Sequence, residues 1–173
     1  MVPPMVFVTL CTWGEVEEEW LVFGVGGVVF AAGLALRIWA QMHLHYRLSV
    51  RKILTTTGPY RYVRNPIYIA NTTMLTAAVM LAELFWFMPI MVLYCAVVYT
   101  LVVRHEESHL LVKYGAPYQA YLDRVSRWFP GRSKDAAPAA NSVRFFYPSL
   151  WAECHNLALL LPFIIKELVV DAL

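Results

Sequence analysis

The sequence predicts an all-α, polytopic membrane helical bundle. Hydrophobic residues make up 60% of the 173 residues and charged residues only 15%, whereas about a quarter of the residues in a soluble domain are charged. Several long apolar stretches alternate with short charged segments along the chain. A surface with so few charges faces lipid over much of its area, so the chain is expected to form a single membrane domain over residues 1–173.

Residues 20–39 form the clearest membrane helix, because a run of about 20 apolar residues suffices to cross the hydrocarbon core. Arg37 lies near one end of this run, where a long basic side chain can reach the interface. Gly27, Ala31 and Ala35 recur at four-residue spacing. Small residues let helix backbones approach closely, so this stripe is expected to face a neighbouring helix.

A membrane helical hairpin is expected over residues 66–103. Pro66 is suited to a first helical position, and an aromatic cluster in the 83–89 turn is suited to the membrane interface. Both arms are short for a full crossing, so tilt, local thinning of the bilayer or burial is expected. Residues 104–130 then leave the membrane as a charged segment.

The C-terminal residues 143–173 are apolar again and follow a linker rich in Ala, Pro, Gly and Ser. They are interrupted by proline and charged residues, so either a final span or a pair of interfacial helices is consistent with them. The sequence does not fix the number of spans beyond three.

The distribution of basic residues predicts the orientation. Residues 41–66 and 104–134 are both rich in Lys and Arg. By the positive-inside rule, both are expected on the cytoplasmic side of an inner, cytoplasmic membrane. The net charge of +2, without a dense basic tract, excludes a nucleic-acid partner. The three cysteines are far apart and form no metal-ligand or disulfide pattern.

The first charged segment contains Gly58-Pro59-Tyr60-Arg61-Tyr62-Val63-Arg64-Asn65-Pro66-Ile67-Tyr68. The Gly-Pro pair sets a tight bend, and Asn65 lies at the start of the following helix. Helix N-termini present free N–H groups that favour anions. On charge alone, the segment also fits a loop whose arginines bind lipid phosphates.

The second charged segment places Glu106 and Glu107 side by side where a helix leaves lipid. Such acids are costly unless they are paired or bound to a ligand. The simplest interpretation is a solvated helix face on which one of them pairs with Arg104 or Lys113. Tyr118, Tyr121 and Arg127 follow at short intervals.

Together the two segments resemble the isoprenylcysteine carboxyl methyltransferase family, which is similar to the phospholipid N-methyltransferases. The family pattern is a Gly-Pro-Tyr-Arg-Tyr-x-Arg-His-Pro-x-Tyr loop, an apolar hairpin, a Glu-Glu-x-x-Leu motif, an aromatic-Gly pair, two spaced tyrosines and an Arg-x-x-Pro end. The match covers residues 57–130, and the pieces occur in order. Asn65 replaces the usual histidine, and an asparagine cannot titrate near neutral pH.

The resemblance implies transfer of a methyl group from S-adenosylmethionine to a lipophilic acceptor, an isoprenylcysteine-like carboxylate or a lipid headgroup. It implies a cofactor pocket at the cytoplasmic face, built from the loop and the later helices, with membrane lipids as neighbours and no metal ion. The acceptor would enter sideways between the hairpin and the 20–39 helix. By resemblance, the catalytic residues are Arg64, Asn65 and Arg127, and the cofactor-binding residues are Gly58, Tyr60, Arg61, Arg64, Asn65, Tyr68, Glu106, Glu107, Tyr118 and Tyr121.

Three alternatives remain. The sequence His105-Glu106-Glu107-Ser108-His109 matches H-E-x-x-H, which is typical of zinc peptidases, with a third ligand drawn from Asp123, Glu153 or His155. An NADPH-dependent reductase of sterol-like lipids has a similar Arg-x-Pro-x-Tyr helix start. A non-catalytic lipid-binding membrane protein would keep the pocket without turnover.

Overall fold

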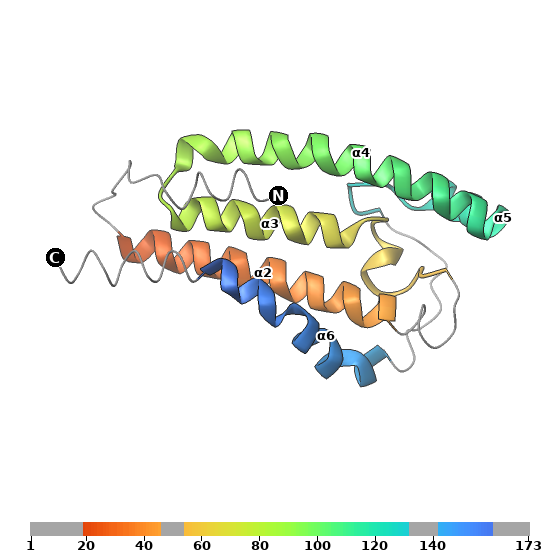
Figure 1. Ribbon diagram of the computed structural model, residues 1–173, viewed down its shortest axis with the longest axis horizontal. Coiled ribbons are helices and arrows are strands. Elements are labelled where there is room, and N and C mark those ends of the chain that lie inside the picture. The colour runs from red at the N-terminus through yellow and green to blue at the C-terminus, as the bar shows by residue number, and fades with distance from the viewer. Residues whose placement is uncertain (1–18, 46–53, 132–141, 161–173) are drawn as a thin grey trace.

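The computed structural model describes residues 19–45, 54–131 and 142–160, and these are helical with connecting turns and without strands. Three helices lie side by side along the long axis of the molecule (Figure 1): α2 (Glu19–His45), α3 (Pro66–Leu81) and α4 (Met88–Tyr114). The prediction of an all-α membrane helical protein is confirmed.

Two of the helices are long and apolar enough to cross a membrane. The qualifying stretches are Trp20–Leu44 and Phe85–Tyr114, and both expose large apolar side chains such as Val28, Leu93 and Leu101. The third helix, α3, has 16 residues and is therefore about 24 Å long, short of the roughly 30 Å hydrocarbon core. It packs against both α2 and α4, and burial is one of the ways in which a short arm was expected to be accommodated.

The contact between α2 and α3 is the most extensive pairing of helices in the described structure. Gly26, Phe30 and Gly33 are buried on the face of α2 that meets α3. The small-residue stripe expected at Gly27, Ala31 and Ala35 is wrong, because these residues are exposed. The packing face lies one residue further around the helix, and on it Phe30 packs against Met74 and Ala77 of α3.

The helix α4 is 27 residues long and continues without a break through Arg104. The predicted membrane arm up to residue 103 and the first part of the predicted 104–130 segment thus share one helix, and the residue at which this helix leaves the membrane stays a prediction. The preceding turn is tight: Glu83 has a φ of 58°, and the 3₁₀ helix η3 (Phe85–Phe87) follows. The exposed Phe85 and Trp86 agree with the expected interfacial aromatic cluster.

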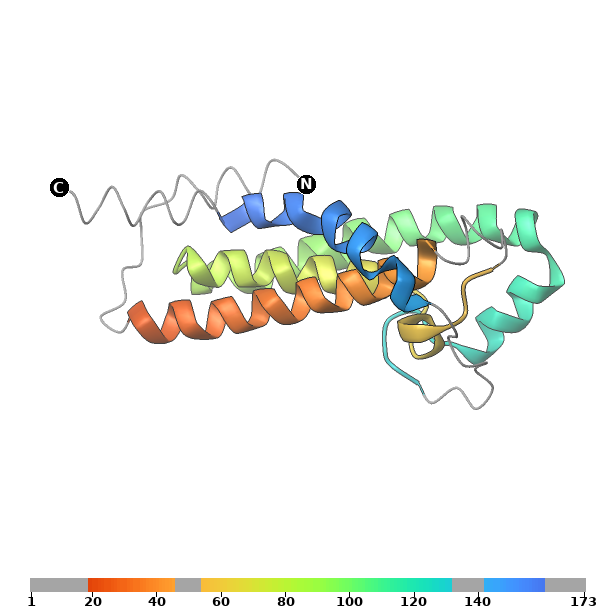
Figure 2. The ribbon, with the colours of Figure 1, turned by 90° about the horizontal axis from the view of Figure 1, so that it is seen from below.

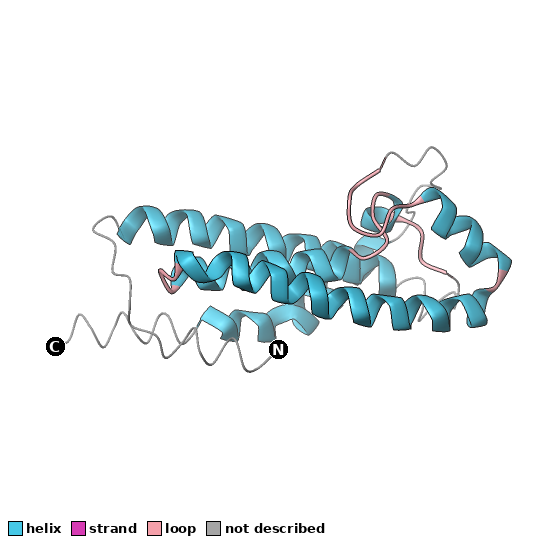
Figure 3. Cartoon of the chain, turned by 90° about the horizontal axis from the view of Figure 1, so that it is seen from above, coloured by secondary structure: helices cyan, strands magenta, loops and turns pink. Residues whose placement is uncertain are grey.

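The two charged segments gather at the end of the bundle opposite this turn. The 3₁₀ helix η2 (Gly58–Arg61) lies before α3, and α5 (Ala116–Arg124) follows α4 after Gly115, whose φ is 60°. Figure 3 shows that the loops at this end lie against one another. A small core of Tyr118, Tyr121 and Val125 holds α5 in place, packed against Leu54 and Leu110.

The C-terminal part that the structure describes consists of η4 (Ser142–Phe145), α6 (Phe146–Glu153) and η5 (Cys154–Leu160). Helix α6 lies obliquely across α2 (Figure 2) and contacts it. Eight residues are too few to cross a bilayer on their own, and both alternatives for residues 143–173, a final span or interfacial helices, stay predictions. The predicted apolar helices of residues 161–173 lie outside the described residues.

The close approach of α2 and α3 can be tested by comparing two glycines of α2, Gly33 in the contact and Gly27 outside it. A Cβ atom on Gly33 would lie 2.7 Å from Met74 Cγ and 3.1 Å from the carbonyl oxygen of Ala70, whereas one on Gly27 would have no neighbour within 4 Å. Overpacking of this kind costs about 1–3 kcal/mol. We expect Gly33→Ala to lower the thermal unfolding midpoint in detergent and Gly27→Ala to leave it unchanged. Equal midpoints for the two variants would contradict this packing.

Candidate functional site

A cavity of about 540 Å³ opens between the charged segments and the ends of α2, α3 and α4. We call it the main cavity. A smaller cavity of about 110 Å³, the side cavity, shares part of its wall and extends to Tyr118 and Tyr121. The polar residues that line the main cavity are Arg37, Tyr60, Arg64, Asn65, Tyr68, Asn71, His105, Glu106 and His109.

Glu107 joins the two motifs. Its Oε2 accepts a 2.5 Å hydrogen bond from Arg127 Nη2, its Oε1 accepts one of 3.2 Å from Arg127 Nε, and Oε1 lies 3.5 Å from Arg64 Nη1. The Glu107 side chain is only 12% exposed, which strengthens the attraction between these charges. We call Arg64, Glu107 and Arg127 the Glu107 cluster. The hydrogen bond to Glu107 raises the pKa of Arg127.

Glu106 and Glu107 have partners other than the basic residues of their own segment. Glu107 pairs with Arg64 and Arg127 rather than with Arg104 or Lys113. Glu106 is exposed and accepts a 2.8 Å hydrogen bond from the Tyr68 hydroxyl. Both acids therefore face the first motif across the pocket, so a purely solvated helix face does not describe them.

Backbone hydrogen bonds fix the loop before α3 against the segment after α5. The Arg64 amide donates to the carbonyl oxygen of Ser126 at 2.9 Å, and the Gly131 amide donates to that of Tyr62 at 2.9 Å. The Asn65 side-chain amide donates to the carbonyl oxygen of Arg127 at 3.3 Å. Asn65 thus lines the main cavity and also links the loop before α3 to the segment after α5. This link needs a hydrogen-bond donor but no titratable group.

Three buried tyrosines line the side cavity: Tyr60 of η2, and Tyr118 and Tyr121 of α5. The Tyr121 hydroxyl donates a 2.8 Å hydrogen bond to the carbonyl oxygen of Tyr60, and the rings of Tyr118 and Tyr121 are 6.0 Å apart. Burial raises the pKa of all three side chains, that of Tyr118 to about 12. Their hydroxyls consequently stay neutral and can act as hydrogen-bond donors throughout the physiological range.

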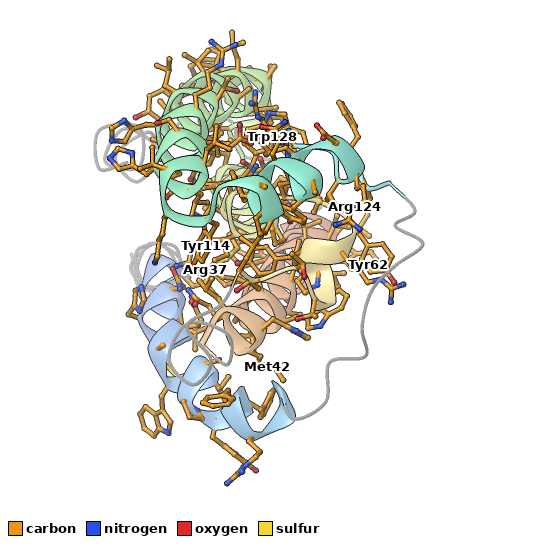
Figure 4. The ribbon with its side chains drawn as sticks, turned by 90° about the vertical axis from the view of Figure 1, so that its right-hand side faces the viewer. Arg37, Met42, Tyr62, Tyr114, Arg124 and Trp128 are labelled. Atoms are coloured by element: carbon orange, nitrogen blue, oxygen red, sulfur yellow. The ribbon has the colours of Figure 1, made fainter. Side chains whose placement is uncertain are left out.

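Two predicted cofactor-binding residues lie outside the walls of both cavities. Gly58 has a φ of 61°, and a Cβ atom there would lie 2.3 Å from His43 Cδ2, so only glycine fits this turn. The Arg61 guanidinium lies 5.1 Å from the centre of the Tyr62 ring. Figure 4 shows Tyr62 at the outer edge of this end of the molecule. Direct cofactor contacts by Gly58 and Arg61 remain predictions.

Sequence reasoning missed several residues of the site. Arg37 and Asn71 line the main cavity, and buried His43 supports the Gly58 turn, with its Nδ1 3.0 Å from Thr57 Oγ1. A signal for Arg37 existed, because an ionisable residue within a membrane helix marks a functional position by default. Asn71 lies three residues after Tyr68, hence on the same helix face.

The two histidines of the H-E-x-x-H sequence share a helix face, with ring centres 4.4 Å apart. Both line the main cavity. Over the ranges that the structure describes, no group of three or more His, Cys, Asp or Glu side chains is placed to hold a metal ion. Asp123, Glu153 and His155 thus supply no third ligand there.

The fold and the site define a helical membrane protein with a pocket of arginines, carboxylates and tyrosines at one end. The sequence model of the family described as phospholipid methyltransferase matches residues 20–117. This range is more than half of the chain, and the chain belongs to that family, as the resemblance of the two motifs predicted.

The chain is also similar to a curated protein. The chain is 30% identical over 119 residues to the nickel-cobalt-cadmium resistance protein NccN of Alcaligenes xylosoxydans xylosoxydans. These aligned residues cover 69% of this chain and 53% of that protein. The chain therefore spans about half the length of this relative. No solved structure matches the chain.

The buried tyrosines make the stability of the protein sensitive to alkaline pH. The pKa of Tyr118 rises from its ordinary value of 10.0 to about 12, so folding favours the neutral hydroxyl. The resulting stability is fully present below pH 10 and is lost as the pH rises toward 12. We expect unfolding midpoints to fall over this window and to fall less in Tyr118→Phe, which cannot ionise. An identical decline in parent and variant would contradict the assignment to Tyr118.

Proposed function

We propose that the chain transfers a methyl group from S-adenosylmethionine to a lipophilic acceptor at the membrane surface. The acceptor would carry an isoprenylcysteine-like carboxylate or a lipid headgroup. The observation that carries the proposal is the Arg64 side chain: it lines the main cavity, and its Nε is buried without a hydrogen-bond partner in the described structure. A buried donor of this kind is costly unless a ligand satisfies it.

The residues present fit the cofactor. The cavity volume of about 540 Å³ lies within the roughly 300–1,000 Å³ of small-molecule sites. Arg64 would hold the carboxylate of the methionine part together with Asn65, Tyr60 and Tyr68. Glu106 and Glu107 would bind the ribose hydroxyls or the amino group, and Tyr118 and Tyr121 would close the pocket near the adenine.

The chemistry needs alignment more than acid–base catalysis. S-adenosylmethionine, when bound, supplies the electrophilic methyl carbon. The chain's contribution is to hold the acceptor in line with the sulfur–methyl bond and to exclude water, because the positive charge of the sulfonium disperses during transfer. The apolar parts of the wall, Leu44, Pro66, Ile67 and Leu110, are suited to excluding water.

Asn65 bears on the choice of acceptor. Its amide is engaged with the carbonyl oxygen of Arg127, and an amide cannot remove a proton at neutral pH. A carboxylate acceptor is already ionised and needs no base, whereas an ammonium headgroup has to lose a proton first. The asparagine therefore favours the carboxylate among the two proposed acceptors.

A third cavity suits the hydrocarbon part of the acceptor. It measures about 570 Å³ and lies between α3 and α4, with Val29, Ile69, Val92 and Trp128 in its wall. It shares no wall residue with the main cavity, so sideways entry of the acceptor between the hairpin and α2 rests on the resemblance to the family. We place the chain in the inner, cytoplasmic membrane with the main cavity toward the cytoplasm, because the surrounding segments are rich in Lys and Arg.

The cofactor site is tested by titration calorimetry with S-adenosylhomocysteine. We expect Arg64→Ala and Glu107→Gln to weaken binding at least about tenfold, since hydrogen bonds to charged groups contribute about 1.5–3 kcal/mol. The matched controls are Arg104→Ala and Asp123→Asn, which alter exposed residues of the same type outside both cavities. If both test variants remain folded and bind as tightly as the parent, the assignment of the site is wrong.

Ligand binding and metal analysis distinguish the methyltransferase from the reductase and the zinc peptidase. We expect S-adenosylhomocysteine, and not NADPH, to raise the unfolding temperature of the purified protein, because bound ligand stabilises the folded state. Stabilisation by NADPH alone would favour the reductase. One zinc ion per chain would favour the peptidase, for which His105 and His109 would be two ligands and Glu106 the base.

A further inference from the structure

Arg37 lines the main cavity from α2 and, like Leu44 and Asn71, belongs to neither motif. Its side chain is 18% exposed and forms an ion pair with Glu153 of α6, whose side chain is 2% exposed. It also donates from Nη1 to the side-chain oxygen of Asn71 on α3. Figure 4 shows Arg37 where α2 meets α6.

These contacts fix the Arg37 guanidinium but use only some of its N–H donors. The bonds to Glu153 and Asn71 use two N–H donors, and a guanidinium has five. Glu153 is itself fixed, because its Oε2 accepts a 2.5 Å hydrogen bond from the Asn156 side chain. Arg37 therefore lines the cavity with a fixed orientation and with donors that these bonds leave available.

The guanidinium donors that face the main cavity point to a second oxyanion. Arg37 lines it from α2 and Arg64 from the loop before α3. Each arginine also pairs with an acid behind the wall, Arg37 with Glu153 and Arg64 with Glu107. The Glu106 carboxylate already accepts a hydrogen bond from Tyr68. If Arg64 takes the carboxylate of the cofactor, Arg37 is left for an oxyanion that the cofactor does not supply.

We propose that Arg37, held by Glu153 and Asn71, binds an oxyanion of the methyl acceptor. The inference rests on the proposed function and adds to it a residue that recognises the charged group of the acceptor. The contact that fixes Arg37 comes from α6, beyond the residues 20–117 that match the family. Acceptor recognition would thus depend on a part of the chain that the family pattern does not cover.

The test measures binding to protein already loaded with S-adenosylhomocysteine, in detergent and without turnover. One probe pair is N-acetyl-S-farnesylcysteine and its methyl ester, which lacks the carboxylate. The other is lysophosphatidylethanolamine and monoacylglycerol, which lacks the phosphate. We expect the parent to prefer the charged member of one pair and Arg37→Gln to lose that preference, by about tenfold to a hundredfold.

Removing Arg37 alone leaves Glu153 as a buried, unpaired charge, which is strongly destabilising. The double variant Arg37→Gln/Glu153→Gln removes both charges and serves as the second test protein, with Glu153→Gln alone as its control. Loss of preference in the first probe pair identifies a carboxylate source, and loss in the second identifies a phosphate source.

Two results overturn the proposal: a parent without preference for either charged probe, or a folded double variant that keeps the preference of the parent. Failure of the proposed function gives a different result, namely a parent that does not bind S-adenosylhomocysteine. The two failures are distinguishable because binding of S-adenosylhomocysteine is measured on the parent protein, whereas the preference for charged probes is compared only among proteins that are loaded with it.

Discussion

The contact of Glu107 with Arg64 and Arg127 is the interaction on which the site depends. It joins residues from the loop before α3, from α4 and from the segment after α5. Breaking one partner of a buried charge cluster leaves another charge unpaired, which is strongly destabilising. The backbone hydrogen bonds from Arg64 to Ser126 and from Gly131 to Tyr62 reinforce the same junction. Without this junction, the loop before α3 and the end of α4, which form two walls of the main cavity, would not be held at a fixed distance from each other.

The helices supply the frame for this junction. Gly26 and Gly33 allow α2 to approach α3 closely, and the core around Val79, Met91 and Cys95 holds α3 to α4. The lipid-facing surfaces of α2 and α4 remain apolar, so the bundle is stable only where lipid replaces water around it. The polar residues are concentrated at one end and along the inner helix faces, and the membrane explains both locations.

The class of fold was predictable from sequence because a shortage of charge and long apolar stretches are properties of composition. The partners of Glu106 and Glu107 were not predictable, because they lie on segments distant in sequence, whereas Arg104 and Lys113 are the basic residues close to them along the chain. The small-residue stripe on α2 was predicted one residue away from the observed face, since the pattern alone could not weigh Phe30. The motif residues Tyr60, Arg64, Asn65, Tyr68 and Glu106 were placed together by resemblance, and all line the main cavity. Arg37 was interpreted as an interfacial side chain, because only the fold reveals that α6 supplies Glu153.

The uninterrupted course of α4 has a mechanical consequence. Glu106 and Glu107 are carried on the same rigid rod as the lipid-facing turns around Leu93 and Leu101, with no proline, glycine or loop between them to act as a hinge. The wall that these two acids form therefore cannot swing on its own. Any widening of the cavity on this side has to move the whole rod or displace the loop before α3, so the thickness of the surrounding bilayer, which sets the tilt of such a rod, is mechanically connected to the shape of the pocket.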